Sequence, residues 1–211
     1  MIRVMLVDDH AVVRVGFRML LQSAATGIEV VAEAASGEDA LAQLPALTLD
    51  VLMLDLSMPG IGGLETVRRL RAHRPELKIL VLSAHEDTAH ARRALAAGAM
   101  GYLSKRSAPD TLVEALQSLA RGQRYIEPAL AQKLALAQLG DEPDPVAALT
   151  EREFAVFVPL ARGASVAAIA EQLHLSPSTV GTHLYHIKQK LGAANQAELT
   201  LIALRWGVIE A

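Results

Sequence analysis

One short stretch of the chain decides the fold: Val51-Leu52-Met53-Leu54-Asp55-Leu56-Ser57-Met58-Pro59-Gly60. Its apolar beginning is typical of a strand that helices cover on both faces of a parallel sheet. The strand ends at an acid and a loop, and the ligands of open parallel sheets gather at the carboxyl ends of the strands. Asp55 is therefore a candidate reactive group at the edge of a sheet.

The stretch belongs to a series of five βα repeats. Other apolar or β-branched runs predict strands over residues 2–7, 28–34, 78–82 and 101–103. Amphipathic stretches near 12–23, 38–44, 64–72, 88–97 and 109–121 follow the strands, and each is long enough to cross over a parallel sheet. The pattern predicts an α/β domain of the flavodoxin-like (βα)5 type over residues 1–124.

Two further acids follow the first predicted strand. Asp8 and Asp9 come directly after it, so we expect them at the same sheet edge as Asp55. Three converging carboxylates predict a divalent metal site, because hard cations prefer oxygen ligands. Taken singly, each acid also fits a simpler role as a helix cap or as the end of a strand.

A change of pattern follows Gly122. A lone alanine-rich helix is expected over 128–138, and Gly140-Asp141-Glu142-Pro143-Asp144-Pro145 predicts an irregular linker. Residues 125–146 are therefore expected to join two domains, and everything from 147 to 211 has a helical pattern.

Four helices are predicted in this second domain. A capping box at Thr150-Glu151-Arg152-Glu153 begins the first, and the second covers about 166–173. Ser176 caps the third, which runs to about 191, and the fourth covers about 196–205. A helix, a tight turn and a longer helix that opens with small polar residues form a helix-turn-helix, whose second helix would enter the major groove of DNA.

This predicted recognition helix carries side chains that suit DNA. Its hydroxyl, imidazole and amide groups can bond base edges, and its lysines can neutralise phosphates. From Val146 onward five basic residues balance five acidic ones, so a lone tail should bind DNA weakly and a dimer is expected to compensate. The candidate DNA contacts are Ser178, Thr179, Thr182, His183, Tyr185, His186, Lys188 and Lys190.

Composition narrows the function further. The chain of 211 residues has no cysteine, which excludes thiolate metal sites and fits a cytoplasmic protein. No run approaches the roughly 18 to 20 apolar residues of a membrane span, so no membrane partner is expected. A zinc site at His174, His183 and His186 is disfavoured, because no acid or cysteine completes a ligand spacing.

Nearly the whole chain resembles bacterial two-component response regulators of the NarL/FixJ type, which join a receiver domain to a LuxR-type helix-turn-helix. The order of landmarks carries this resemblance. They are Asp8-Asp9, Asp55 with Met58-Pro59-Gly60, Gly62-Gly63, Ser83-Ala84, Gly98-Ala99, Gly101-Tyr102-Leu103 and Lys105, then Leu149-Thr150-Glu151-Arg152-Glu153, Ile169-Ala170, Ser178-Thr179-Val180, His183 and Lys190-Leu191-Gly192.

The resemblance implies a function for each landmark of the first domain. Asp55 would take a phosphoryl group from a sensor histidine kinase, and Mg²⁺ would be held by Asp8, Asp9, Asp55 and the backbone carbonyl of Ser57. Lys105 would neutralise charge, while Ser83 would bond the phosphoryl group and Tyr102 would turn inward behind it. Phosphorylation would promote a homodimer that binds promoter DNA.

Three departures from the family keep other functions open. Gly181 and Tyr185 stand where relatives carry lysine, and Pro159 falls inside the first helix of the tail, where a proline costs ~3 kcal/mol if the helix is regular. The tail could therefore bind a protein partner instead of DNA. An aspartyl-phosphate phosphatase is a weaker alternative, because no second acid follows Asp55 at short spacing to act as acid or base.

Overall fold

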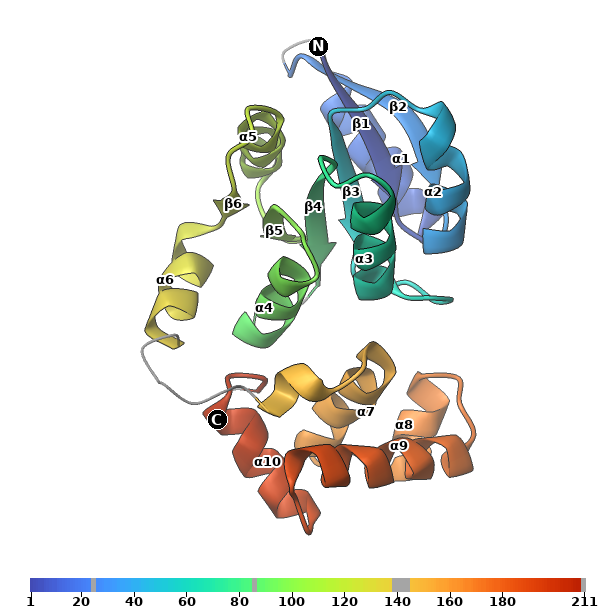
Figure 1. Cartoon of the computed structure of the whole chain (residues 1–211), viewed down its shortest axis with the longest axis vertical. Helices are drawn as coiled ribbons and strands as arrows, with labels where there is room; N and C mark the ends of the chain where they lie inside the picture. The colour runs from blue at the N-terminus through green and yellow to red at the C-terminus, as the bar shows by residue number, and fades with distance from the viewer. Residues whose placement is uncertain (24–25, 85–86, 138–144, 210–211) are drawn as a thin grey trace. The chain divides into compact units, whose positions relative to one another are not determined.

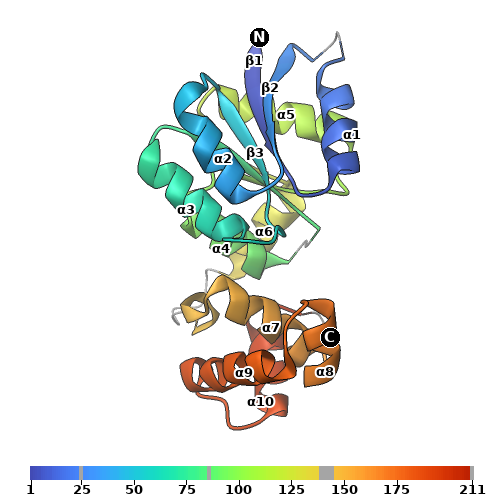
Figure 2. The same cartoon turned by 90° about the vertical axis from the view of Figure 1, so that its right-hand side faces the viewer.

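A computed structural model of the chain describes residues 1–23, 26–84, 87–137 and 145–209. The chain forms two compact units, one of Met1–Glu86 with Ala91–Ala131 and one of Asp87–His90 with Gln132–Ala211. Figures 1 and 2 show a sheet with helices in the first unit and helices in the second. Residues 140–144 of the predicted irregular segment 140–145 lie outside the described residues, and Pro145 begins the 3-10 helix η2 (Pro145–Ala148).

The first unit is built on a parallel sheet with the order β2-β1-β3-β4-β5-β6. The five predicted strands are present as β1 (Ile2–Val7), β2 (Ile28–Ala34), β3 (Val51–Asp55), β4 (Lys78–Ser83) and β5 (Gly101–Ser104). The sixth, β6 (Tyr125–Ile126), was not predicted, because two residues are too few to show a period. It pairs with β5 beyond the predicted end of this domain.

Helices cover both faces of the sheet (Figure 2). Phe17 and Leu20 of α1 (Ala11–Leu21) pack with Leu112 and Leu116 of α5 (Pro109–Ala120) against one face. The opposite face carries α2 (Gly37–Gln43) and α3 (Gly63–His73) (Figure 2). The remaining helical segments here are η1 (Leu44–Ala46) and α4 (Thr88–Ala96).

The strand register decides where the acids lie. Val7 of β1 is paired with Leu54 of β3, so the residues that follow them, Asp8 and Asp55, are level at the carboxyl end of the sheet. All five residues of β3 are buried, as the apolar run predicted for a central strand. The sheet therefore holds the two acids side by side.

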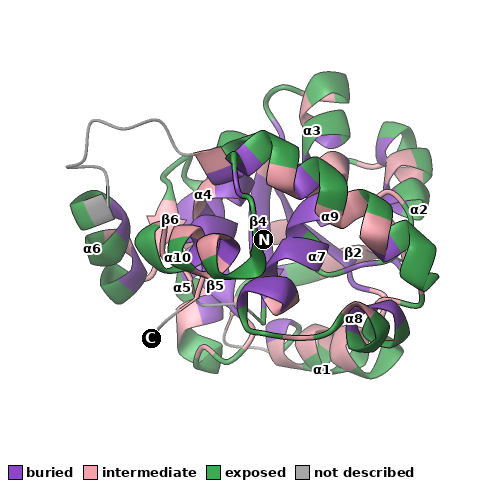
Figure 3. Cartoon of the chain, turned by 90° about the horizontal axis from the view of Figure 1, so that it is seen from below, coloured by how far each residue is buried: buried purple, intermediate pink, exposed green. Residues whose placement is uncertain are grey.

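The second unit is helical. After α6 (Pro128–Ala137) and η2 (Pro145–Ala148) come α7 (Glu151–Ala161), α8 (Val166–Gln172), α9 (Pro177–Leu191) and α10 (Gln196–Arg205), so the four predicted tail helices are confirmed. The capping box is also present, since Thr150 Oγ1 accepts the Glu153 amide at 3.2 Å and Glu153 Oε2 accepts the Thr150 amide at 2.7 Å. Buried residues recur along α9 at helical spacing, with exposed residues between them (Figure 3).

Pro159 lies inside α7, which continues for two more residues. Because a proline has no amide hydrogen, the carbonyl of Ala155 loses its helical partner. Ala155 is exposed, so water can bond that carbonyl. The sequence left open whether the helix kinks at Pro159 or ends early, and the structure shows that it continues to Ala161.

Candidate phosphoacceptor site and recognition helix

Two buried carboxylates form the centre of the first site. Asp8 and Asp55 are 4% and 2% exposed, whereas Asp9 is half-buried. The backbone amide of Ser57 donates to Asp55 Oδ1 at 3.1 Å, which fixes one face of that carboxylate. Parallel pairing thus brings together the three acids that the sequence predicted at this edge.

Lys105 bridges the two buried carboxylates. Its Nζ atom lies 2.7 Å from Asp8 Oδ2 and 2.8 Å from Asp55 Oδ2. The loop that carries Lys105 is held to the neighbouring strand, because its amide donates to the Ser83 carbonyl at 2.8 Å. The sequence prediction of an ammonium beside Asp55 is met by this geometry.

The electrostatics of the pair follow from burial. Burial raises the pKa of Asp55 above its ordinary value, and the hydrogen bonds from Lys105 and from the Ser57 amide oppose this effect only in part. Burial lowers the pKa of Lys105, but its hydrogen bonds to Asp55 and Asp8 outweigh that effect, so this pKa is raised. Lys105 therefore stays a cation, and its single charge does not balance three acids.

The residues fit a divalent cation. Ligand atoms of Asp8, Asp9, His10 and Asp55 all lie within 4.8 Å of one another. Asp9 Oδ1 is buried and accepts no hydrogen bond from any described residue, which is costly unless a cation neutralises it. His10 was not among the predicted residues, although its place directly after two acids was a usable signal.

Ser83 and Tyr102 are both fully buried. They lie on adjacent strands, where Tyr102 pairs with Val81 and Ser83 pairs with Ser104. The burial of Tyr102 agrees with the inward orientation that the resemblance implies. The switch roles of both residues, and the role of the Ser57 carbonyl, stay predictions.

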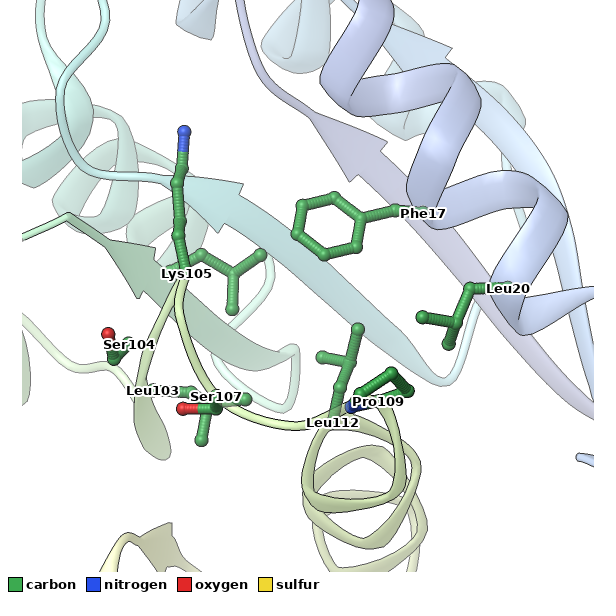
Figure 4. Close-up of a pocket in the computed structure, with 9 residues that line it drawn as sticks. Phe17, Leu20, Leu103, Ser104, Lys105, Ser107, Pro109 and Leu112 are labelled. Atoms are coloured by element: carbon green, nitrogen blue, oxygen red, sulfur yellow. The ribbon is translucent and has the colours of Figure 1, made fainter.

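An apolar pocket of about 40 Å³ lies on the α1 and α5 side of the Lys105 loop. Figure 4 shows Phe17, Leu20 and Leu112 around it, while the ammonium of Lys105 points away from them. Sites for small molecules usually measure roughly 300–1,000 Å³, so this pocket is too small to hold a separate substrate. Its apolar walls instead support the stem of Lys105.

The recognition helix α9 exposes part of the predicted set of DNA-contact residues to solvent. Ser178, Thr179, Thr182, Tyr185 and His186 are exposed on α9, and His183 is half-buried. Gly181 is open enough that an added Cβ atom would meet nothing within 4 Å. The side chains able to read base edges are thus accessible.

Both lysines of α9 already have partners within this unit. Lys190 Nζ lies 2.6 Å from Glu153 Oε2, and Lys188 Nζ donates to the Ala194 carbonyl at 3.0 Å. Burial raises the pKa of Glu153, but hydrogen bonds from Lys190 and Thr150 outweigh it, so the pKa of Glu153 is lowered. Glu153 is therefore ionised, and its negative charge offsets the positive charge that Lys190 could bring to a phosphate.

The fold and these two sites define a class of protein, the regulators that join a receiver domain to a helix-turn-helix. Residues 4–117 match the response regulator receiver domain, and residues 147–203 match the bacterial regulatory proteins of the luxR family. No described helix is both long enough and apolar enough for a membrane span.

Relatives and solved structures agree with this class. The chain is 43% identical to the response regulator UvrY of Escherichia coli (strain K12), covering 100% of this chain and 97% of that one. It is 39% identical to the response regulator GacA of Pseudomonas aeruginosa, covering 100% and 99%. The response regulator RcsB in its DNA complex is 28% identical, with a TM-score of 0.61 over 97% of this chain and 98% of that one.

The chain belongs to the NarL/FixJ family of response regulators, with a receiver domain and a LuxR-type helix-turn-helix. The predicted fold class is confirmed. Members of this family are DNA-binding regulators of transcription and not enzymes that act on an external substrate.

Proposed function

We propose that phosphorylation of Asp55 by a sensor histidine kinase switches this protein between two states and promotes binding of promoter DNA as a dimer. One observation carries the proposal: the Lys105 ammonium lies within 2.8 Å of both buried carboxylates. A carboxylate that attacks a phosphoryl group faces charge repulsion, so preorganised cations at the reacting oxygen are the main requirement. We assign residues 1–124 to the receiver, 125–146 to the linker and 147–211 to the helix-turn-helix.

Mg²⁺ is the second cation of this proposal. It would be held by Asp8, Asp9, Asp55 and the backbone carbonyl of Ser57, and it would neutralise charge on the phosphoryl oxygens. Its presence is supported by Asp9 Oδ1, a buried oxygen that accepts no hydrogen bond from a described residue. Asp55 supplies the nucleophilic oxygen and becomes an acyl phosphate, so the protein at most catalyses its own phosphorylation and dephosphorylation.

The switch follows from what the new group binds. Once attached to Asp55, the phosphoryl group would take over Lys105 and accept a hydrogen bond from the Ser83 hydroxyl. The change would then reach Tyr102, because Tyr102 and Ser104 lie on β5, which pairs with β4, the strand that carries Ser83. Phosphorylation can bias the two states only by the difference between these contacts in each state.

The helix-turn-helix would read DNA with neutral side chains. Ser178, Thr182, Tyr185 and His186 are exposed and can bond base edges, while Thr179 and His183 would contact the DNA backbone. Since Lys188 and Lys190 are paired within the unit, one tail neutralises few phosphates, which makes a dimer necessary for useful affinity. RcsB has been solved as dimers bound to DNA.

The paired lysines also favour a second candidate, in which the tail binds a protein partner. The two functions differ in their response to salt, because DNA binding releases counterions and weakens steeply as salt rises. A mobility shift on duplexes selected from a random pool, repeated over a salt series, separates them. Absence of any duplex binding by the phosphorylated dimer would favour the protein partner.

The phosphoacceptor is tested by intact mass. We expect the protein with Mg²⁺ and acetyl phosphate to gain the mass of one phosphoryl group, and we expect Asp55→Asn to gain none. The exposed but hydrogen-bonded Asp50 offers a control carboxylate, because Asp50→Asn changes a side chain at the opposite end of β3, where Asp50 Oδ2 accepts the Arg3 amide. Equal mass gain in parent and Asp55→Asn would refute the assignment.

The cytoplasm is the compartment in which we place this regulator.

A further inference from the structure

We propose that His10 is an additional metal ligand of the receiver, so that the site accepts a transition-metal ion such as Mn²⁺ through one nitrogen and several oxygens. The inference rests on the proposed function, because it concerns the same cation site. It adds a residue that the family's acidic ligand set does not contain.

The position of the His10 ring is the first support. Its Nδ1 atom lies 2.9 Å from Asp9 Oδ1 and 3.2 Å from Asp8 Oδ1. Adjacent ligands of an octahedral ion with bonds of about 2.1 Å are about 3.0 Å apart by simple geometry. The nitrogen therefore stands where a neighbouring ligand of the same ion would stand.

The second support is that the two carboxylate oxygens of Asp8 have different partners. Asp8 Oδ2 faces the Lys105 ammonium at 2.7 Å, while Asp8 Oδ1 accepts the backbone amide of His10 at 2.8 Å. Lys105 thus occupies one side of the carboxylate pair and His10 the other. A cation between Asp8 Oδ1, Asp9 Oδ1 and His10 Nδ1 would not displace the lysine.

The local backbone is the third support. His10 is the N-cap residue of α1, yet its side chain makes no capping hydrogen bond. Serine, threonine, aspartate and asparagine are the residues that normally cap a helix. At this position the imidazole instead turns back toward the acids, which is the orientation that ligation needs.

Ligand chemistry then decides which ion benefits. Mg²⁺ binds oxygen almost exclusively and gains little from an imidazole, whereas Mn²⁺, although it also favours oxygen, is a transition metal that gains more from a nitrogen ligand. Removing the ring should therefore weaken Mn²⁺ binding roughly tenfold and leave Mg²⁺ binding within about twofold. The alternative is that the ring only donates a hydrogen bond to the acids, and then both ions would respond alike.

Pulsed electron paramagnetic resonance of the Mn²⁺-loaded full-length chain tests the proposal. We expect a directly bound ¹⁴N coupling in the parent and its loss in His10→Ala, with competition by Mg²⁺ giving the affinities of both ions. His73→Ala is the matched control, because His73 is an exposed histidine on α3 whose Nδ1 bonds the Arg69 carbonyl. The coupling should survive that change.

Two failures are distinguishable. If Mg²⁺ and Mn²⁺ bind at the acids but the parent shows no nitrogen coupling, or keeps it in His10→Ala, the role of His10 is wrong and the phosphoacceptor stands. If neither ion binds and Asp55 also gains no phosphoryl group, the proposed function fails together with this inference.

Discussion

Lys190 and Glu153 form an ion pair, with 2.6 Å between Nζ and Oε2, that joins the last turns of α9 to the first turn of α7. Glu153 also closes the capping box of α7, so one carboxylate caps the start of α7 and holds the end of α9. The pair makes a lysine of the recognition helix a structural residue of the tail.

Lys190→Ala should therefore destabilise the tail by roughly 1–2 kcal/mol, because a buried carboxylate loses a charged hydrogen bond while the lysine is itself partly exposed. Chemical denaturation of the full chain, followed by the fluorescence of Trp206, measures this change. Lys188→Ala is the control, since it loses only a bond to an exposed carbonyl. An equal loss of stability in the two variants would show that the ion pair contributes no more than the hydrogen bond of Lys188.

The same pair predicts a dependence on pH. The pKa of Glu153 is lowered from its ordinary value of 4.5, so its stabilising effect is complete above 4.5 and is lost as pH falls through the lower, folded-state value. The difference in unfolding free energy between parent and Glu153→Gln should thus shrink in that acidic window. A difference that is constant from pH 7 down to pH 3 would contradict this assignment.

Lys105→Ala should slow phosphorylation of Asp55 by acetyl phosphate by about 100-fold, since preorganised charge at a reacting oxygen typically contributes at least that much. The rate of mass gain at saturating Mg²⁺ measures the effect. Lys78→Ala is a matched control at the opposite end of the sheet, where Lys78 Nζ donates to the Ala120 carbonyl. A parent-like rate in Lys105→Ala would remove the ammonium from the mechanism.

Gly181→Lys should strengthen DNA binding and steepen its salt dependence by about one counterion for each tail. The structure offers room for the side chain, since nothing lies within 4 Å of the position of an added Cβ. Gly181→Ala separates charge from helix stability, because it should add roughly 0.8–1 kcal/mol of stability without changing the salt slope. If Gly181→Lys leaves the slope unchanged in a mobility-shift series, α9 does not face the phosphates.

Gly63→Ala should disturb the phosphoacceptor loop. An added Cβ atom would lie 2.5 Å from the Leu56 carbonyl oxygen, so the backbone directly after Asp55 would have to shift. We expect a loss of about 1–3 kcal/mol in stability, as for other overpacked sites, together with slower mass gain at Asp55. Gly16→Ala, at an open position inside α1, should instead add roughly 0.8–1 kcal/mol of stability and leave the mass gain at Asp55 unchanged.

The parallel sheet and its acidic edge were predictable because strand periodicity and chain order determine them. The apolar run before Asp55 and the pair Asp8-Asp9 placed the acids at the ends of strands, and parallel pairing then brought those ends together. The same logic did not reveal β6, whose two residues carry no period and are ordered only by pairing with β5.

The polar partners of the tail were harder to predict because they depend on tertiary contacts. Lys190 and Glu153 are 37 residues apart in sequence, and a lysine on a recognition helix looks like a phosphate contact until its neighbour is known. His10 was missed for a different reason. Its place directly after two acids was a usable signal, but the proposed role also depends on the direction of its ring, which no sequence period encodes.

The short strand β6 has a consequence for the behaviour of this protein in a crowded cell. An exposed sheet edge offers a row of free backbone donors and acceptors, and other chains can pair with it to form aggregates. Here that side of the sheet ends in only two residues, so it provides almost no template for such pairing. The reversible dimer that we propose is thereby protected from irreversible association through this edge.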